Sequence, residues 1–182
     1  MQEIPAVRAP EFPSGLDWVN TPAPVALADL RGRFVAVDFW TSSCVNCHHN
    51  AALLREVRTR HPRELVLIGV HAPKFPAERQ LAHLRAAVHE LGIDHPVVQD
   101  ADHAIRQEWA VRAWPTVVIV DPEGRIVGSA TGEIDVGQFE EALGRWIAQH
   151  DERGTLVRAD PTTTKKRLTA KTTRRHAGMA RD

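Results

Sequence analysis

The stretch VAVDFWTSSCVNC, residues 35–47, decides the fold prediction and concentrates the reactive side chains at one point of the chain. Its first part is apolar except for Asp38, as in a buried strand, and the residues after it can continue as a helix. Cys44 and Cys47 are the only cysteines of the chain and lie where that helix would begin. A helix start stabilises a thiolate through free backbone N–H groups and the positive end of the macrodipole. Because the thiolate is the reactive form of cysteine, the pair is suited to thiol–disulfide exchange.

Asp38 supports this interpretation, because a charge inside an apolar strand is costly unless it has a task. A carboxyl group buried near the second thiol would have a raised pKa. It could then take the proton from Cys47 as that sulfur attacks a mixed disulfide on Cys44. We therefore predict Cys44, Cys47 and Asp38 as the catalytic residues. The alternative for Asp38 is a structural carboxylate with its hydrogen bonds satisfied.

Two segments carry a resemblance to a known superfamily. Residues 37–47, VDFWTSSCVNC, resemble the active-site segment of the thioredoxin superfamily, and residues 111–118, VRAWPTVV, resemble its cis-proline loop. The resemblance implies an α/β, thioredoxin-like fold with a mixed central sheet and helices on both faces. It also implies a cis peptide bond before Pro115 and a substrate-facing surface formed by Pro115 and Trp114. Trp40 would lie beside the site and bind substrate, with plain core packing as its alternative.

Shorter pieces are similar to the TlpA-like thioredoxin domain of the NHL-repeat-containing protein 2 family, in family order over roughly residues 11 to 145. They are LDW at 16–18, LADLRG at 27–32, GVHAPKF at 69–75 and HPVV at 95–98. The chain departs from thioredoxins proper at Ser43, where they carry tryptophan, and at Val45 and Asn46, where they carry Gly-Pro. The pair between the cysteines tunes the reduction potential, so both redox directions stay open.

Other uses of the cysteines compete with this prediction. The run CVNCH, residues 44–48, matches the c-type haem attachment pattern, but the preceding strand and the spacing to Asp38 favour redox chemistry. Cys44, Cys47 and His48 could contribute to a zinc site, although a second cysteine pair is lacking. A structural disulfide is the third alternative. A non-catalytic protein-binding module is the main alternative to an enzyme, and a peroxide-reducing enzyme would need a further cysteine motif. We expect no cofactor and no metal.

The chain divides into three predicted regions. Five prolines within residues 1–26 indicate an extended N-terminal arm, because prolines at this density prevent a long helix. Residues 27–150 form the predicted thioredoxin-like domain, and 43% hydrophobic residues are enough for a core. Residues 151–182 carry nine Lys/Arg against four Asp/Glu and have no apolar periodicity, so they are predicted to be a disordered basic tail.

Partners and compartment follow from the same observations. The N-terminal residues lack the basic segment and the following apolar segment that make up a secretory signal. No apolar run approaches the ~18 residues that a membrane-spanning helix needs. We therefore expect a cytoplasmic protein without a membrane anchor. A formal net charge of zero gives no argument for nucleic-acid binding. The expected partners are protein or small-molecule disulfides and thiols, with electrons from a reductase or a thiol pool.

Hydrophobic periodicity predicts the element order of the domain. Strands are expected at residues 34–39, 65–70, 96–98, 116–120 and 125–129. Helices are expected at residues 44–60, 81–91, around 105–109 and after residue 135. This alternation of strands and helices, with two strands joined by the turn at 121–124, gives a mixed sheet covered on both faces.

Overall fold

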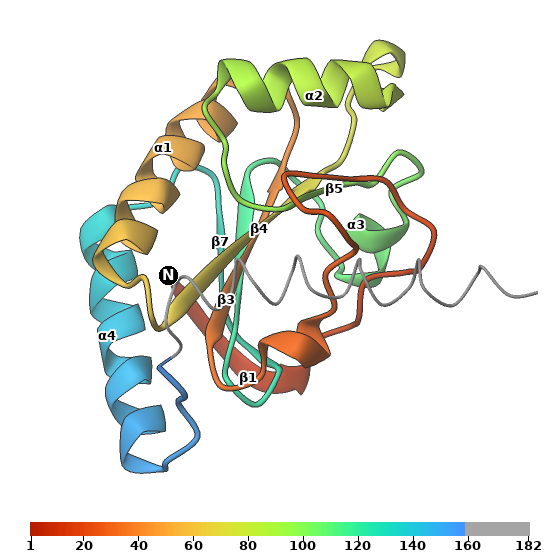
Figure 1. The fold of residues 1–182 in the computed structure, drawn as a ribbon. Coiled ribbons are helices and arrows are strands. Elements are labelled where there is room, and N and C mark those ends of the chain that lie inside the picture. The colour runs from red at the N-terminus through yellow and green to blue at the C-terminus, as the bar shows by residue number, and fades with distance from the viewer. Residues whose placement is uncertain (159–182) are drawn as a thin grey trace, which may run out of the picture.

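The structure is a computed structural model that describes residues 1–158, except for the side chains of residues 2–6 (Figure 1). Of the predicted tail, residues 151–158 are described, and the Val157 N–H donates to the Gly32 carbonyl at 2.7 Å, whereas residues 159–182 lie outside the described residues. The strands are β1 (Gln2–Arg8), β2 (Trp18–Val19), β3 (Phe34–Trp40), β4 (Leu65–His71), β5 (Val97–Gln99), β6 (Thr116–Val120) and β7 (Arg125–Thr131). The helices are α1 (Val45–Arg60), α2 (Leu81–Glu90), α3 (Ala104–Glu108) and α4 (Val136–Glu152), with short 3-10 turns η1 (Leu27–Leu30) and η2 (Pro76–Arg79).

The seven strands form one mixed sheet in the order β1-β7-β6-β3-β4-β5-β2. Strand β3 runs parallel to β4, which runs parallel to β5, whereas β6 and β7 are antiparallel to their neighbours. All seven residues of β3 are buried, as expected for a central strand covered on both faces. The predicted fold class is confirmed, and every strand predicted between residues 27 and 150 is present.

The proline-rich N-terminal segment supplies both outer strands of the sheet. Strand β1 pairs with β7, and its register shifts between Glu3 and Val7, around Pro5. Proline lacks the N–H that a ladder needs, so it is confined to edge strands and bulges. Trp18 and Val19 form the other edge by pairing with β5. Edge strands this short, or interrupted by proline, give no alternating pattern in the sequence, which explains why only an extended arm was predicted there.

The two faces of β3 are covered by different helices, because successive side chains of a strand point to opposite faces. Phe34 and Ala36 pack with α1 and α4, which lie together on one side of the sheet in Figure 1. Val35, Val37 and Phe39 pack on the other side with α3 and the N-terminal segment. Within residues 1–158, no helix is long and apolar enough to cross a membrane.

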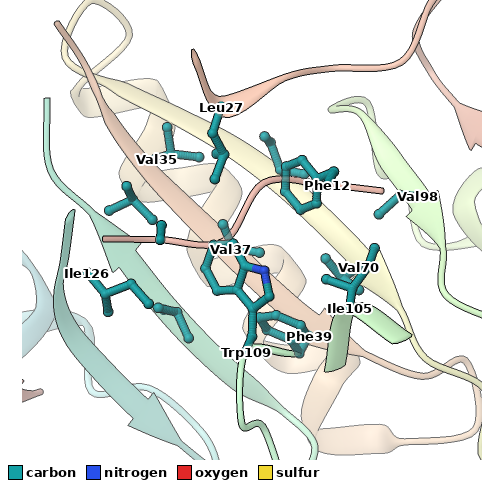
Figure 2. Packing of buried hydrophobic residues seen from close by; sticks show 14 of the residues in the cluster. Phe12, Leu27, Val35, Val37, Phe39, Val70, Val98, Ile105, Trp109 and Ile126 are labelled. Carbon is teal, nitrogen blue, oxygen red and sulfur yellow. The ribbon is translucent and has the colours of Figure 1, made fainter. Parts of the chain in front are cut away.

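Aromatic rings fill the core on the α3 side of the sheet (Figure 2). Trp109 stacks on Phe12 with ring centroids 6.0 Å apart, and its centroid lies 5.7 Å from that of Phe39. Phe12 is 8% exposed, so this anchor buries nearly the whole ring. Burying a side chain of this size stabilises a fold by about 1.5–3 kcal/mol. The N-terminal segment is thus held by core packing as well as by its two strands.

A third cluster of buried residues lies at the carboxyl ends of β3 and β4. It joins Trp40 and Cys47 to the first half of α1, to α2 and to β5. Its buried members are Val19, Trp40, Cys47, Ala51, Leu84, Val88, Ile93 and Val97. Cys44 and Trp114 pack against this cluster from the outside, so the two motifs singled out in the sequence meet at one end of the sheet.

Candidate functional site

The two cysteines occupy the start of α1 and differ in exposure. Cys44 is the N-cap residue, with extended backbone, and its Sγ accepts a hydrogen bond from the Cys47 N–H at 3.3 Å. Cys44 is half-buried, whereas Cys47 is 1% exposed. The two sulfurs are joined in a disulfide. An outer sulfur with a backbone N–H directed at it, next to an enclosed one, is suited to attack by Cys44 and to internal resolution by Cys47.

Asp38 lies on the α1 side of β3. Alternation along the strand puts it on the face of Ala36, which packs with α1, and of Trp40, which clusters with Cys47. The Asp38 side chain is 3% exposed, and its Oδ1 has no hydrogen-bond partner among the described residues. Burial raises the pKa of this carboxyl to about 7. At neutral pH the group can therefore both hold and release a proton.

Trp40 lies in the core beneath the site and not on its surface, since its side chain is 1% exposed. Its ring packs edge-on against His71, with centroids 4.8 Å apart. The indole also lies close to Gly69 of β4, where an added Cβ would come within 3.1 Å of its nitrogen. Trp40 was predicted to bind substrate, with core packing as its alternative; at 1% exposure it packs in the same buried cluster as Cys47.

The predicted proline loop reaches the same end of the sheet. The Trp114–Pro115 peptide bond is cis, and the Pro115 carbonyl accepts a hydrogen bond from the Gly132 N–H at 2.9 Å. Trp114 is partly exposed and packs against the cluster that contains Cys47. The Arg106 guanidinium lies 4.2 Å from the centroid of the Trp114 ring, within cation–π distance. The structure thus brings an aromatic surface with a cation next to the cysteine pair.

Three histidines from three elements converge on Ser42, two residues before Cys44. The Ser42 N–H donates to Nε2 of His71, the last residue of β4, at 3.3 Å. The Ser42 hydroxyl lies 2.8 Å from Nε2 of His83 on α2. The Ser42 carbonyl accepts from Nε2 of His48 on α1 at 2.8 Å. Every backbone and side-chain polar group of Ser42 therefore has an imidazole partner.

Glu78 holds the same turn from the side of η2. Its carboxylate accepts from the Thr41 hydroxyl at 2.5 Å and from the backbone N–H groups of Lys74 at 2.6 Å and Phe75 at 3.3 Å. The Ser43 hydroxyl also bonds to it. Burial alone would raise the pKa of Glu78, but these hydrogen bonds outweigh it and lower the pKa to about 2. Glu78 is therefore a permanent anion at neutral pH.

The sequence singled out neither Glu78 nor Ser42, and it placed His71 only within the run GVHAPKF, residues 69–75, without a role. The available signal for His71 was its position, because it ends an apolar parallel strand, and functional side chains of α/β sheets collect at the carboxyl ends of such strands. Glu78 gave no signal of its place in the site, since the partners that join it to the cysteine turn, Thr41 and Ser43, are more than thirty positions away in the chain. Within residues 1–158, no group of three or more metal-ligating side chains is arranged to hold a metal ion.

The fold and the cysteine pair at the start of α1 together define a thioredoxin-like protein. The chain belongs to the Redoxin family, whose model matches residues 2–143. Among solved structures, it is similar to a crystal structure of a thioredoxin-like superfamily protein, with a TM-score of 0.70 and 23% identity over 76% of this chain and 95% of that one. At this identity the likeness concerns the fold.

Among curated proteins, the chain is 42% identical to human NHL repeat-containing protein 2 over 130 residues, which are 70% of this chain and 18% of that protein. This confirms the predicted resemblance. The chain thus spans less than a fifth of the length of the NHL-repeat relatives that it matches. It is also 23% identical to a thiol-disulfide oxidoreductase of Bacillus subtilis, YkuV, over 77% of this chain and 94% of that protein.

Proposed function

We propose that the protein is a thiol–disulfide oxidoreductase that works through Cys44 and Cys47. The observation that carries the proposal is the pairing of a half-exposed cysteine at the N-cap of α1 with an enclosed one a turn later. A helix N-terminus lowers the pKa of a thiol and so raises its thiolate fraction at neutral pH. Membership of the Redoxin family and the likeness to a bacterial thiol-disulfide oxidoreductase support the proposal.

The proposed reaction begins with the reduced pair. The Cys44 thiolate attacks one sulfur of a partner disulfide, which forms a mixed disulfide and releases the first partner thiolate. Cys47 then loses its proton and attacks the Cys44 sulfur, which releases the second partner thiol. Two electrons have then passed to the partner, and the protein holds the Cys44–Cys47 disulfide seen in the structure. A reductase or a thiol pool supplies the two electrons that restore the dithiol.

Asp38 is the proposed proton acceptor for Cys47. The second step needs a base inside the protein, because Cys47 is 1% exposed and has little access to water. A buried carboxyl with a pKa of about 7 is ionised in part of the molecules at neutral pH and is basic enough to take a thiol proton. Its place on β3, under the helix that carries Cys47, supports this role.

The partner is proposed to bind over Trp114 and Pro115. Like Cys44, this loop packs against the buried cluster that contains Cys47, and it presents the partly exposed indole ring of Trp114, which offers apolar contact area, whereas Pro115 itself is buried. Exposed Val45, directly after Cys44, enlarges this apolar surface. Protein or small-molecule disulfides are therefore the proposed substrates, and the surface does not select between them.

The Cys47→Ser variant tests the proposal directly. Cys44 can still attack a partner disulfide, but nothing within the protein can then resolve the adduct, so partners linked through Cys44 should accumulate and disappear on adding reductant. The matched Cys44→Ser variant should form no such adducts. If Cys47→Ser traps nothing and the wild-type pair cannot be cycled between dithiol and disulfide, the oxidoreductase proposal is wrong. A doubly substituted protein that still binds its partner would then indicate a binding module.

A further inference from the structure

His71 is a fully buried polar residue close to the cysteine pair and has no place in the reaction proposed above. Its side chain is fully buried, at 0% exposed. Its Nδ1 lies 2.7 Å from Oε1 of Gln99, and its Nε2 lies 3.3 Å from the backbone nitrogen of Ser42. The imidazole thus links the carboxyl end of β4 to the turn that presents Cys44.

The direction of each hydrogen bond in this chain is fixed by its two ends. The Gln99 Nε2 donates to the Glu78 carbonyl at 2.9 Å, so Gln99 must direct its Oε1 to His71 as an acceptor. His71 Nδ1 therefore carries a proton and donates it to Gln99. A backbone N–H can only donate, so Nε2 must accept from Ser42 and carries no proton. The bond network is satisfied only by neutral imidazole with its proton on Nδ1.

We propose that His71 is a positioning residue for Cys44: its neutral Nε2 holds the Ser42 N–H and thereby fixes the turn from which Cys44 attacks. The turn is short, since the Cys44 N–H donates to the Thr41 carbonyl at 3.2 Å, so a shift at Ser42 is passed on to Cys44. The inference rests on the proposed function, because it assigns His71 to the reactivity of Cys44. It predicts that a protonated His71 releases the turn.

The surroundings of His71 favour the neutral form. Burial lowers its pKa from the ordinary value and outweighs the hydrogen bond to Gln99. Of the charged or titratable groups that face it, Glu78 acts in the opposite direction and raises the pKa, whereas His83 lowers it further. Trp40, on β3, presents only its uncharged ring. When protonated, the imidazole would direct a second N–H at the Ser42 N–H, and the bond would be lost.

Two substitutions at His71 separate this role from simple core packing. In His71→Gln, the amide is as long as the ring, so its oxygen can reach the Ser42 N–H and its NH₂ group can reach Gln99, with no group to titrate. In His71→Asn, the amide is one carbon shorter, so it can donate to Gln99 but leaves the Ser42 N–H without an acceptor. Both remove the ring, so packing loss is common to the pair.

The experiment measures the alkylation rate of Cys44 in the reduced protein between about pH 5 and about pH 8, together with amide hydrogen exchange at Ser42. Loss of a buried hydrogen bond changes an equilibrium about tenfold or more, so His71→Asn should slow alkylation by about that factor and expose the Ser42 amide. His71→Gln should stay near the wild-type rate at neutral pH. After correction for the thiolate fraction of Cys44, only the wild type should lose further reactivity on acidification.

His83→Ala is the matched control, because its contact to Ser42 lies on the exposed side of the turn, and it should change the rate by less than about threefold. If His71→Asn folds and alkylates like the wild type, or if Gln rescues no better than Asn, the positioning role is wrong. Such a result leaves the proposed function untouched while wild-type exchange is active. An inactive wild type with a protected Ser42 amide would instead refute the function.

Discussion

Two carboxyl groups near the cysteine pair, Asp38 and Glu78, are buried to the same extent, but their pKa values are shifted in opposite directions. Each side chain is 3% exposed. The pKa of Asp38 is raised by burial to about 7, whereas hydrogen bonds overcome the burial of Glu78 and lower its pKa to about 2. Burial alone therefore does not decide the protonation state here. The supply of hydrogen-bond donors around each carboxylate decides it.

The donor supply follows from the element that carries each residue. Asp38 lies in the central strand, paired with β4 at Gly69 and with β6 at Val117, so the backbone N–H groups around it are already used in the ladder. Glu78 lies in η2. The N–H groups of Lys74 and Phe75, just before η2, have no partner in the sheet and donate to the Glu78 carboxylate. Asp38, in the strand, can therefore exchange a proton near neutral pH, whereas Glu78, in the turn, stays ionised and has a structural role.

The largest effect should come from removing the structural carboxylate. Glu78→Leu removes the acceptor of the fully buried Thr41 hydroxyl and of the part-buried N–H groups of Lys74 and Phe75, and the loss of these charge-assisted hydrogen bonds together should cost about 3–5 kcal/mol of unfolding free energy. Urea denaturation at neutral pH measures this loss. Glu78→Gln keeps an acceptor oxygen and should lose less than half as much. Equal losses in the two variants would show that packing, and not hydrogen bonding, accounts for the role of Glu78.

The two carboxyl groups also show which residues of the site could be predicted from the sequence and which could not. Asp38 was predicted because its signal is local: a charge within an apolar strand, six residues before Cys44. The central strands and helices were likewise predicted from periodicity within each segment. Glu78 and His71 act through partners 37 and 29 positions away, and only folding brings those pairs together. No pattern within the η2 segment indicates that its glutamate is buried.

The edges of the sheet show the same limit. Strands β3, β4 and β6 were predicted because a strand covered on both faces is apolar throughout. Strand β2 has only two residues, and its place is fixed by pairing with β5 about eighty positions later. The burial of Trp40 depends on the missing side chain at Gly69 in the neighbouring strand, which the sequence of β3 does not contain. Contacts between segments therefore account for most of what was missed.

The second prediction concerns Asp38, whose Oδ1 has no hydrogen-bond partner among the described residues. A raised pKa means that folded Asp38 keeps its proton between pH 3.8 and about pH 7, where the unfolded chain has lost it, so stability falls as pH rises through this window. The full shift corresponds to about 4 kcal/mol, and we expect Asp38→Asn, which carries no titrating group, to recover most of it. Urea denaturation should show Asp38→Asn more stable than wild type at about pH 8 and similar at about pH 4.

The same variant separates stability from chemistry. Asp38→Asn has no base for Cys47, so single-turnover kinetics should show slower resolution of the mixed disulfide, by about tenfold or more, and unchanged formation. Glu90→Gln, at an exposed carboxylate of α2, is the control and should change neither rate nor stability profile. Equal rates for both steps in Asp38→Asn would remove Asp38 from the mechanism. A flat difference in stability across pH would contradict its raised pKa.

The smallest expected effect isolates one donor to Glu78. Thr41 is fully buried, and Thr41→Val preserves its shape while removing only the hydroxyl that donates to the Glu78 carboxylate. The carboxylate keeps its other donors, so the loss should be about 1–2 kcal/mol, smaller than that of Glu78→Leu. Thr59→Val removes an exposed hydroxyl that bonds within α1 and should cost less than about 0.5 kcal/mol.

In the Glu78→Leu background, Thr41→Val should cost nothing or even restore stability, because the hydroxyl then has no acceptor to lose. If the two substitutions are instead additive in urea denaturation, Glu78 does not depend on Thr41, and its low pKa must come from the Ser43 hydroxyl and the backbone donors.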